Sequence, residues 1–509
     1  MVSIVACLAL CLFSAEDIDD GPSFYIGKRT IAPWRLGSSI SGDYVSVITV
    51  LNTTGLVALQ GFDGIAFLAG TSAGLILALL IVAEPMRKSG KFTTGDVVAS
   101  RFSGQALRIG VAIVTIGVAA TFLLMQIAVV GRVTAFVLGR TDTATQAVCT
   151  VIVGALIVYY APMGGMRGTV TVQIFKTGLL LCAIFTVIIV ALNRFDWNIY
   201  HLLVAAEKGS GLGYSYLAPG NSSSSGVLGA ADRFSLPFTA TFAVLTLPHM
   251  TMRFFAAPDE RSLRTAMRWS ASLTTVLCAG LIVIGISVAA LVGKIPLYES
   301  NPSGEYGALL LAAHLDDRGF ILAVVATAVF VTALAGIAGA VMSAASSLAR
   351  DLYSQGIRNG KASTSRELLF ARWSALLIGA LGTLAASAIS FNVHLLFVLG
   401  ITLGASVLTP VVLYTLFWKG FTRAGALWCI YGSAVITLTL LALSPLASGN
   451  PGALFPSLDF DYFPLRNPGL VTVPSGFVLG WLVSKVEGGN KKRSAPPARM
   501  AHEYSHEYS

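Results

Sequence analysis

Apolar segments long enough to cross a lipid bilayer recur along almost the whole chain. A membrane helix needs about 20 predominantly apolar residues, and 55% of the 509 residues here are hydrophobic while only 12% are charged. Because a helix satisfies its own backbone polar groups in lipid, the pattern predicts an all-α integral membrane protein with about 12 full spans. They lie at roughly 36–60, 64–83, 107–138, 145–162, 170–192, 234–256, 270–293, 320–349, 369–389, 392–418, 424–444 and, more weakly, 470–486.

The chain begins with an apolar run that is too short to span a bilayer. At about 1.5 Å per residue, residues 1–13 ("MVSIVACLALCLF") reach about 20 Å, less than a hydrocarbon core of roughly 30 Å. A signal peptide is one interpretation, but no basic segment precedes the run and the acidic "EDIDD" follows closely. We favour the other interpretation, a truncated N-terminal helix that together with its cytoplasmic linker makes up residues 1–35.

The basic residues fall mainly on one set of alternating loops. If residues 14–35 are cytoplasmic, most of the 34 Lys and Arg residues are assigned to that side, with Lys176 and Arg253 at the ends of their spans counted in the adjoining loops, and Arg132 alone is assigned to the interior of a span. The positive-inside rule then predicts a multi-pass protein of the cell membrane with a cytoplasmic C-terminus. The net charge of +9 is thereby explained by topology and by contact with membrane lipid, and we expect no nucleic-acid partner.

Ten of the spans divide into two sets of five, at residues 36–192 and 234–418. Because five is an odd number, the second set enters the membrane from the opposite face, which is the inverted-repeat arrangement of many secondary transporters. An extracellular loop, 193–233, joins the two sets. Two additional C-terminal helices at 419–487 and a disordered cytoplasmic tail at 488–509 complete the predicted organisation.

The first helix of each set is interrupted at a corresponding place. Ser and Gly residues surround Asp43 in "LGSSISGDYVSV", and Pro237 and Pro248 interrupt "FSLPFTATFAVLTLPHM". Paired interruptions indicate a binding site near the bilayer midplane, because freed backbone carbonyls can bind a cation there. The alternative is a pair of ordinary kinks. A carboxylate at the bilayer centre costs about 2.5–3.5 kcal/mol on insertion scales, so Asp43 beside one interruption favours a binding site over a structural carboxylate.

Seven stretches occur in the order in which one transporter family carries them, from about residue 23 to 444. They are "SFYIGKR", "SISGDYVSV", "LQGFDG", "GKFTTGDVVASRF", "YYAPMGGMRGTVTVQIFK", "LPHMTMRFFAAPDERSLRTAMRW" and "SSLARDLYS". In these stretches the chain resembles the sodium:solute symporter family, and within it the cation:acetate or monocarboxylate branch. The resemblance implies a five-plus-five inverted-repeat core of the leucine-transporter type, with extra terminal helices. It also implies uptake of a small monocarboxylate (acetate, propionate or pyruvate) by cation symport and alternating access, with no particular oligomeric state.

The same resemblance assigns a cation site to the interrupted first helix. Asp43 matches the acidic or amide residue that relatives carry there, and the carbonyls of Ser41 and Tyr44 match those that bind sodium. A carboxylate beside free carbonyls suits a hard cation, or a proton on the carboxylate itself.

The eighth core helix should complete this cation site with two adjacent hydroxyl residues. At the matching positions, sixteen and fifteen before Asp351, this chain has Ala335 and Gly336. In the fifth helix, Gln173 stands where sodium-coupled relatives have Asp. These departures remove oxygen ligands, so we slightly favour a proton over sodium as the coupling ion, and we expect no cofactor.

Three further residues are candidates for the substrate site. A guanidinium can grip both oxygens of a small acid, so Arg132 is a candidate for the substrate or its access path; the alternative is that it snorkels to the extracellular interface. His249 is a candidate proton relay or a hydrogen-bonded structural residue. Asn52 either lines the cavity or bonds a neighbouring helix.

Other functional classes lack their sequence signals. A channel would need a filter-like segment, an ATP-driven pump a nucleotide motif such as G-x-x-x-x-G-K-[ST], and an intramembrane enzyme a catalytic pair such as His-Glu-x-x-His; the predicted spans contain none of these. We therefore expect no enzyme. Two alternatives stay open: a sodium-coupled symporter of another small solute, such as an amino acid or a sugar, and a transporter-like membrane sensor.

Overall fold

The computed structural model describes residue 9 and residues 21–494, apart from 141, 161–164, 221–225, 389–392 and 451–452. Within these residues the secondary structure is helical, except for one isolated β-bridge between Ser448 and Phe455. The prediction of an all-helical fold is confirmed. The apolar run at the N-terminus, apart from residue 9, and the last fifteen or so residues of the chain lie outside the described part.

Each of the twelve predicted spans falls on one helix or on a short series of helices. These are α3 (Pro33–Tyr44) with α4 (Val47–Gln60), α5 (Phe62–Leu77) with η2 (Ala78–Val82) and α6 (Ala83–Ser89), α8 (Gln105–Val137), α9 (Thr143–Tyr160), α10 (Gly165–Asn193), α12 (Val227–Val244) with α13 (Pro248–Phe255), α14 (Glu260–Leu291), α17 (Phe320–Ser346) with η4 (Ser347–Ile357), α18 (Thr364–Ala388), α19 (Val393–Leu403) with η5 (Gly404–Leu408) and α20 (Thr409–Phe417), α21 (Arg423–Leu427) with η6 (Trp428–Gly432) and α22 (Ser433–Ala442), and α23 (Gly469–Ser494).

Not all of these helices are long and apolar enough to cross a membrane on their own. Among the described residues, nine helices pass by length and composition, or ten if the bent pair α3 and α4 counts as one span. The chain is thus a multi-pass membrane protein, while the exact number of spans and the inverted repeat stay predictions. Several of the helices contain π-helical turns, among them η4, which continues α17.

The first predicted interruption lies between α3 and α4. The two helices are bent by 54°, and Val45, with φ −83° and ψ 75°, carries the change of direction. Ser46 then starts the new helix as its N-cap, because its hydroxyl accepts a hydrogen bond from the amide of Thr49 at 3.3 Å. The Ser- and Gly-rich segment therefore ends one helix and begins another within the same span.

The second predicted interruption lies between α12 and α13. Leu247 is extended, with ψ 121°, and Pro248 occupies the first turn of α13. Proline favours an extended residue before it and has no amide hydrogen for the preceding turn, so the chain breaks at Pro248. The other proline, Pro237, lies inside α12, which continues through it.

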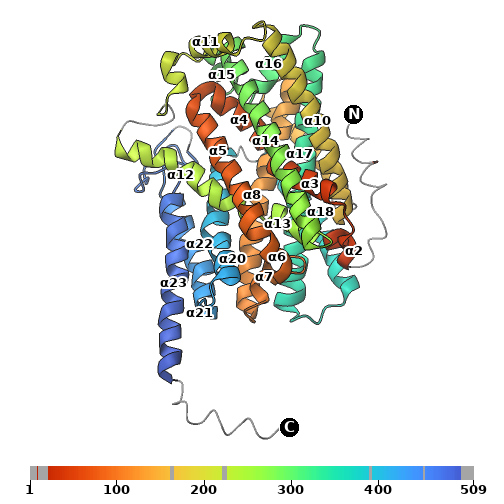
Figure 1. The fold of residues 1–509 in the computed structure, drawn as a ribbon, viewed down its shortest axis with the longest axis vertical. Helices are drawn as coiled ribbons and strands as arrows, with labels where there is room; N and C mark the ends of the chain where they lie inside the picture. The colour runs from red at the N-terminus through yellow and green to blue at the C-terminus, as the bar shows by residue number, and fades with distance from the viewer. Residues whose placement is uncertain are drawn as a thin grey trace.

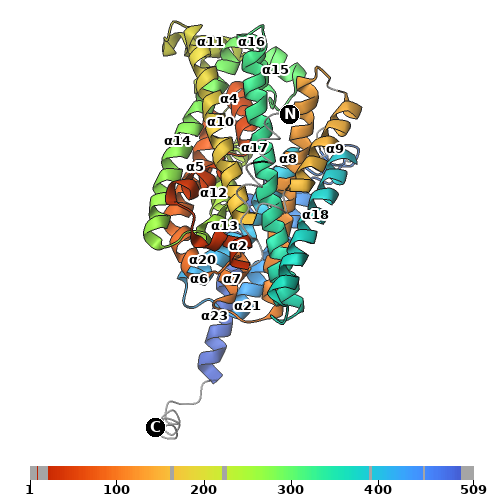
Figure 2. The same cartoon turned by 90° about the vertical axis from the view of Figure 1, so that its right-hand side faces the viewer.

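The helices form an elongated bundle whose two ends differ (Figures 1 and 2). One end, called here the α11 end, carries α11 (Ile199–Gly209), α15 (Lys294–Ser300) and α16 (Gly307–Leu315). The other, called the α7 end, carries α6 and α7 (Thr94–Ala99), and α23 extends beyond it.

Two predicted boundaries differ from the structure. The loop expected at 193–233 contains α11, the 3₁₀ helix η3 (Gly213–Leu217) and the first turns of α12. The tail expected from 488 begins as helix, because α23 continues to Ser494 before Pro496 and Pro497, which cannot continue a helix.

Candidate functional site

Asp43 lies in the last turn of α3, directly before the interruption, and is 5% exposed. Its Oδ2 accepts a hydrogen bond from Nε of Arg253 at 2.7 Å. Its Oδ1 accepts one from Nε2 of Gln173 at 2.5 Å and lies 3.5 Å from Nη2 of Arg253. Three helices, α3, α10 and α13, therefore meet at this one carboxylate.

Arg253 comes from α13, the helix that follows the second interruption, and is 2% exposed. Besides Asp43, its guanidinium donates to the hydroxyl of Thr169 at 2.9 Å and to the sulfur of Met166 at 3.1 Å. A buried ion pair is costly to break, since the remaining charge is left without a partner. The pair of Asp43 and Arg253 thus joins the two interrupted helices directly.

Lys176 supplies a second buried base, from α10, and is 1% exposed. Its amine donates hydrogen bonds to the backbone carbonyls of Gly42 and Val45, the latter at 2.7 Å. These are carbonyls that the interruption frees, and they lie on either side of Asp43. The ammonium therefore occupies the place beside the broken helix in which a cation was expected.

The carbonyls involved are displaced by one residue from those that the resemblance implied. The Ser41 carbonyl accepts the amide of Val45 at 2.9 Å and so still belongs to the helix. The Tyr44 carbonyl accepts the amide of Ser46 at 3.0 Å and the hydroxyl of Thr49 at 3.1 Å. Both are satisfied locally, because α3 remains helical through Tyr44, so the free carbonyls begin one position later.

The expectation that Arg132 alone is a base within a span is wrong. Lys176 and Arg253 were assigned to loops because they stand near the ends of apolar runs, but the structure buries both. Lys176 was the easier to find. It interrupts the apolar stretch "VTVQIFKTGLLL" three residues after Gln173, and residues three apart share one face of a helix.

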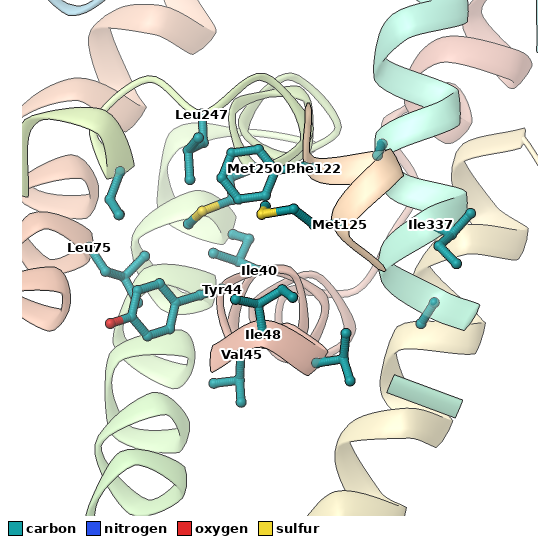
Figure 3. Close-up of a cluster of buried hydrophobic side chains, with 14 of the residues drawn as sticks. Ile40, Tyr44, Val45, Ile48, Leu75, Phe122, Met125, Leu247, Met250 and Ile337 are labelled. Atoms are coloured by element: carbon teal, nitrogen blue, oxygen red, sulfur yellow. The ribbon is translucent and has the colours of Figure 1, made fainter. Parts of the chain in front are cut away.

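A cavity of about 70 Å³ opens beside Asp43. At roughly 15 Å³ for each water, it has room for about five water molecules. Apolar side chains form much of its wall, and Figure 3 shows Tyr44 and Ile48 of the broken helix opposite Phe122, Leu247 and Met250. The polar lining residues are Asp43, Tyr44, Ser46, Thr49, Asn52, Thr53, Thr71, Gln126 and His249.

Three buried polar atoms of this lining have no hydrogen-bond partner within the described protein. They are the hydroxyl oxygen of Thr53, Oε1 of Gln126 and Nδ1 of His249. A buried polar group without a partner costs free energy unless a ligand or water satisfies it. Two of the predicted substrate residues, Asn52 and His249, thus lie in the cavity wall, and Gln126 joins them.

Arg132 lies outside the residues that line the cavity. Its Nη1 is 3.2 Å from Oε2 of Glu305, which lies between α15 and α16 at the α11 end. Its Nε lies 3.5 Å from the carbonyl of Ala128 in its own helix. The Arg132 side chain is 22% exposed, so its ion pair with Glu305 faces the surface at the α11 end. A role for Arg132 in the access path stays a prediction.

The positions of the two missing hydroxyl residues have a packing explanation. A Cβ atom at Gly336 would collide with the side-chain amide of Gln126, so a larger residue there would require this side chain to move. The carbonyl of Ala335 accepts a hydrogen bond from Nε2 of Gln173 at 3.3 Å. Residue 336 therefore leaves space for Gln126 in the cavity wall, and residue 335 offers a backbone oxygen to Gln173 instead of a hydroxyl.

A second group of buried charges lies at the α7 end. Asp96 of α7 is 3.2 Å from Arg108 and 2.9 Å from Arg350, and Arg350 is 3.3 Å from Glu367. We call Asp96, Arg108, Arg350, Asp351 and Glu367 the α7-end cluster. Its remaining carboxylate, Asp351, lies 3.6 Å from Nη1 of Arg108 and accepts hydrogen bonds from the hydroxyls of Thr93 at 2.7 Å and Ser347 at 3.1 Å. None of the five residues is among those that line the cavity.

Comparison with known proteins gives a consistent result. Residues 24–432 match the model of the Sodium:solute symporter family. The chain is 31% identical over 493 residues to the Monocarboxylic acid transporter of Corynebacterium glutamicum, covering 95% of this chain and 89% of that protein. It is 32% identical over 476 residues to the Uncharacterized symporter YwcA of Bacillus subtilis, covering 93% and 91%.

Solved structures show the same fold. A Na⁺-coupled sialic acid symporter in a substrate-bound outward-open state superposes with a TM-score of 0.72 at 15% identity, covering 95% of this chain and 96% of the other. Mhp1, a nucleobase-cation-symport-1 family transporter in a closed conformation, superposes with a TM-score of 0.53 at 12% identity, covering 95% and 97%. At these identities the likeness concerns the fold alone.

Proposed function

Because this chain belongs to the sodium:solute symporter family, we propose that it takes up a small monocarboxylate such as acetate, propionate or pyruvate by symport with a cation. The family makes it a non-enzymatic solute symporter. The chemical class of the solute and the preference for a proton over sodium are our proposals, and they rest on the cavity beside Asp43.

The observation that carries the proposal is the charge of the buried group that reaches the cavity through Asp43; Arg253 and Lys176 belong to this group but are not among the residues that line the cavity. Two buried bases, Arg253 and Lys176, meet one carboxylate, Asp43. When both bases are protonated the site has one positive charge more than negative charges, and a buried charge without a counter-ion is unfavourable. A monoanion in the cavity balances it. The relative from Corynebacterium glutamicum, whose name is Monocarboxylic acid transporter, supports this class of solute.

The size and polarity of the cavity fit the same class. Room for about five water molecules suits a solute of a few heavy atoms better than a sugar. The hydroxyl of Thr53, and Nδ1 of His249 when it carries the proton, can donate to a carboxylate or a keto oxygen, whereas Oε1 of Gln126 can accept from a water molecule or a solute hydroxyl. The apolar wall formed by Phe122, Leu247 and Met250 accommodates the short carbon chain.

A proton is favoured over sodium as the coupling ion. Sodium is a hard cation that needs several oxygen ligands, and here two hydroxyl ligands are replaced by Ala335 and Gly336. The freed carbonyls of Gly42 and Val45 already accept hydrogen bonds from Lys176. A sodium ion would have to displace this amine before it could bind.

The predicted orientation places the α7 end in the cytoplasm and the α11 end outside. Alternating access would then move the half-helices on either side of the two interruptions, since each is an element that can bend without losing a regular hydrogen-bond ladder. The ion pair of Asp43 and Arg253 joins the two interrupted helices, so a change in the charge of this site acts on both helices.

The test is uptake of labelled pyruvate into proteoliposomes that contain the purified full chain. An inward proton gradient should drive accumulation, and an inward sodium gradient at equal pH on both sides should not. Protein-free liposomes correct for passive entry of the neutral acid. Accumulation driven by sodium alone would exclude proton coupling, and an absence of pyruvate, acetate and propionate flux would exclude the monocarboxylate class, leaving another solute or a sensor.

A further inference from the structure

We propose that Lys176 is the group that carries the coupling proton, and that its ammonium takes the place of sodium at the interrupted helix. This inference rests on the proposed function and deepens it, because it names the atom that gains and loses the proton. It also predicts one proton for each monocarboxylate and no net movement of charge.

The geometry around the amine supports this role. Lys176 belongs to α10, yet its Nζ reaches across to the carbonyls of Gly42, in the last turn of α3, and of Val45, the residue at the change of direction in the broken helix. Oxygen atoms so placed form a cage for a small cation. An ammonium group is itself a compact cation with three donors, so it satisfies the cage without any ion from solution.

Lysine is also the member of this group that can exchange a proton. The guanidinium of Arg253 stays protonated in proteins, and Asp43 is held by Arg253 and by Gln173. A lysine amine, by contrast, can become neutral when it is buried. A neutral amine would still donate to the two carbonyls, but a hydrogen bond from a charged donor is roughly twice as strong.

The charged or titratable groups of the described chain that face Lys176 are few. Asp43 on α3 is the carboxylate that acts on it, and Arg253 and His249 on α13 are the cationic and titratable groups of the same site. With Asp43 and Arg253 paired, the net charge of the site depends on Lys176. The site is positive when the amine is protonated and neutral when it is not.

Proton and monocarboxylate should therefore bind together. The protonated site favours the anion, and the anion favours the protonated amine, since the affinities of two coupled ligands change reciprocally. On the release side one N–H bond of the ammonium breaks, the electron pair stays on Nζ and the proton passes to a water molecule. On the loading side the neutral amine takes a proton from water. The empty carrier then returns without net charge.

The first experiment separates proton exchange from solute binding. In Lys176→Arg the positive charge becomes permanent, so the ratio of proton-driven accumulation to exchange of internal for external pyruvate should fall at least tenfold. Lys208→Arg, an exposed position on α11, is the matched control and should change neither. In the unaltered protein a pH dye inside the liposomes should report one proton per pyruvate, and an imposed membrane potential should have no effect. Normal proton-driven accumulation by Lys176→Arg would overturn the inference.

The second experiment needs no transport and uses sodium alone as the probe. Thermal unfolding of the purified chain is compared in sodium chloride and choline chloride at equal ionic strength. A ligand that binds only the folded state raises the midpoint, so the unaltered protein should show no sodium-dependent shift. Lys176→Ala, which empties the cage, should gain one, whereas Lys208→Ala should not. A sodium-dependent shift in the unaltered protein would overturn the inference even if the variants failed to fold.

The two experiments also separate the inference from the proposed function. If no monocarboxylate flux or exchange occurs but only Lys176→Ala gains a sodium shift, the amine occupies the cation cage and the solute class is wrong. If flux occurs and sodium drives it, the solute class stands and the role of Lys176 is wrong.

Discussion

The two buried groups of charges in this protein are built from the same residue types but differ in their balance. Beside the cavity, Asp43 meets two bases, Arg253 and Lys176, so positive charge is in excess. In the α7-end cluster, three carboxylates meet two arginines, Arg108 and Arg350, so negative charge is in excess. Asp43 of the first group lines a cavity whose wall has polar atoms without a partner in the described chain, while Asp351 of the second is held by two hydroxyls and lies 3.6 Å from Arg108.

The group beside the cavity is therefore a candidate binding site, whereas the α7-end cluster has a structural role. An excess charge that protein groups already solvate, as the hydroxyls of Thr93 and Ser347 do for Asp351, needs no further partner. An excess charge beside a cavity is balanced by whatever enters the cavity. The net charge of each group, and whether it reaches a cavity, therefore predict whether a substitution there will lower transport or stability.

The largest expected effect is that of Asp43→Asn. It leaves Arg253 and Lys176 without a carboxylate, and a buried charge without its partner is strongly unfavourable, so concentrative uptake should be lost while the protein still inserts in the membrane. Pyruvate uptake and the amount of membrane-inserted protein are measured together. Asp317→Asn, at an exposed position, should behave like the unaltered protein. Normal accumulation by Asp43→Asn would remove this residue from the mechanism.

The next effect is on stability and concerns Asp96→Asn at the α7 end. This carboxylate contacts both Arg108 and Arg350, and its loss should lower the free energy of unfolding by about 3 kcal/mol, seen as a lower midpoint of thermal unfolding in detergent. The concentration for half-maximal uptake should hardly change in the protein that remains folded. A large change in that concentration with unchanged stability would contradict a structural role for the α7-end cluster.

A smaller effect is expected for Asp351→Asn in the same cluster. Its removal leaves two carboxylates, Asp96 and Glu367, for two arginines, and an asparagine can still accept a hydrogen bond from Thr93. The loss of stability should be smaller than for Asp96→Asn, because Asp351 has one arginine partner at 3.6 Å whereas Asp96 has two at 3.2 and 2.9 Å. The same thermal unfolding assay measures it, with Asp96→Asn as the reference. Equal losses for the two variants would show that the charge balance of the cluster does not matter.

The smallest effect is expected at the α11 end, for Arg132→Ala. Its ion pair with Glu305 is partly exposed, and such pairs contribute about 0.2–1 kcal/mol. We therefore expect the concentration for half-maximal uptake to rise less than about fivefold, without loss of coupling. A double-mutant cycle with Glu305→Gln measures the pair itself. A hundredfold rise would place Arg132 in direct contact with the solute.

The sequence was sufficient for the parts of the molecule that depend on composition and on helix-breaking residues. The apolar runs, the interruption beside Asp43 and the break at Pro248 follow from rules that act within a few residues. The contacts of the broken helix with Arg253 and Lys176 did not follow, because they join residues 210 and 131 positions apart. Both bases stand near the ends of apolar runs, where a positive charge is usual; the apolar residues around Lys176 are a local signal of its burial, whereas Arg253 has no such signal.

Local sequence rules also did not predict which backbone carbonyls of the broken helix lack a helical partner. The resemblance placed them at Ser41 and Tyr44, but they lie at Gly42 and Val45, because the last turn of α3 closes on its own amides. Likewise, Gly336 looks like a lost ligand in the sequence. Only the packing of α8 against α17 shows that the amide of Gln126 fills its place.

The π-helical segment η4 at the α7 end has a wider turn than an α-helix. Arg350 and Asp351 lie within it, and each residue of an α-helix turns the chain by about 100°. If the wide turn were to tighten into an ordinary helix, these two side chains would swing away from Asp96 and Thr93 together. The contacts of the α7-end cluster would then break through the rewinding of a single helix, with no hinge in a loop and no transfer of its charges into lipid.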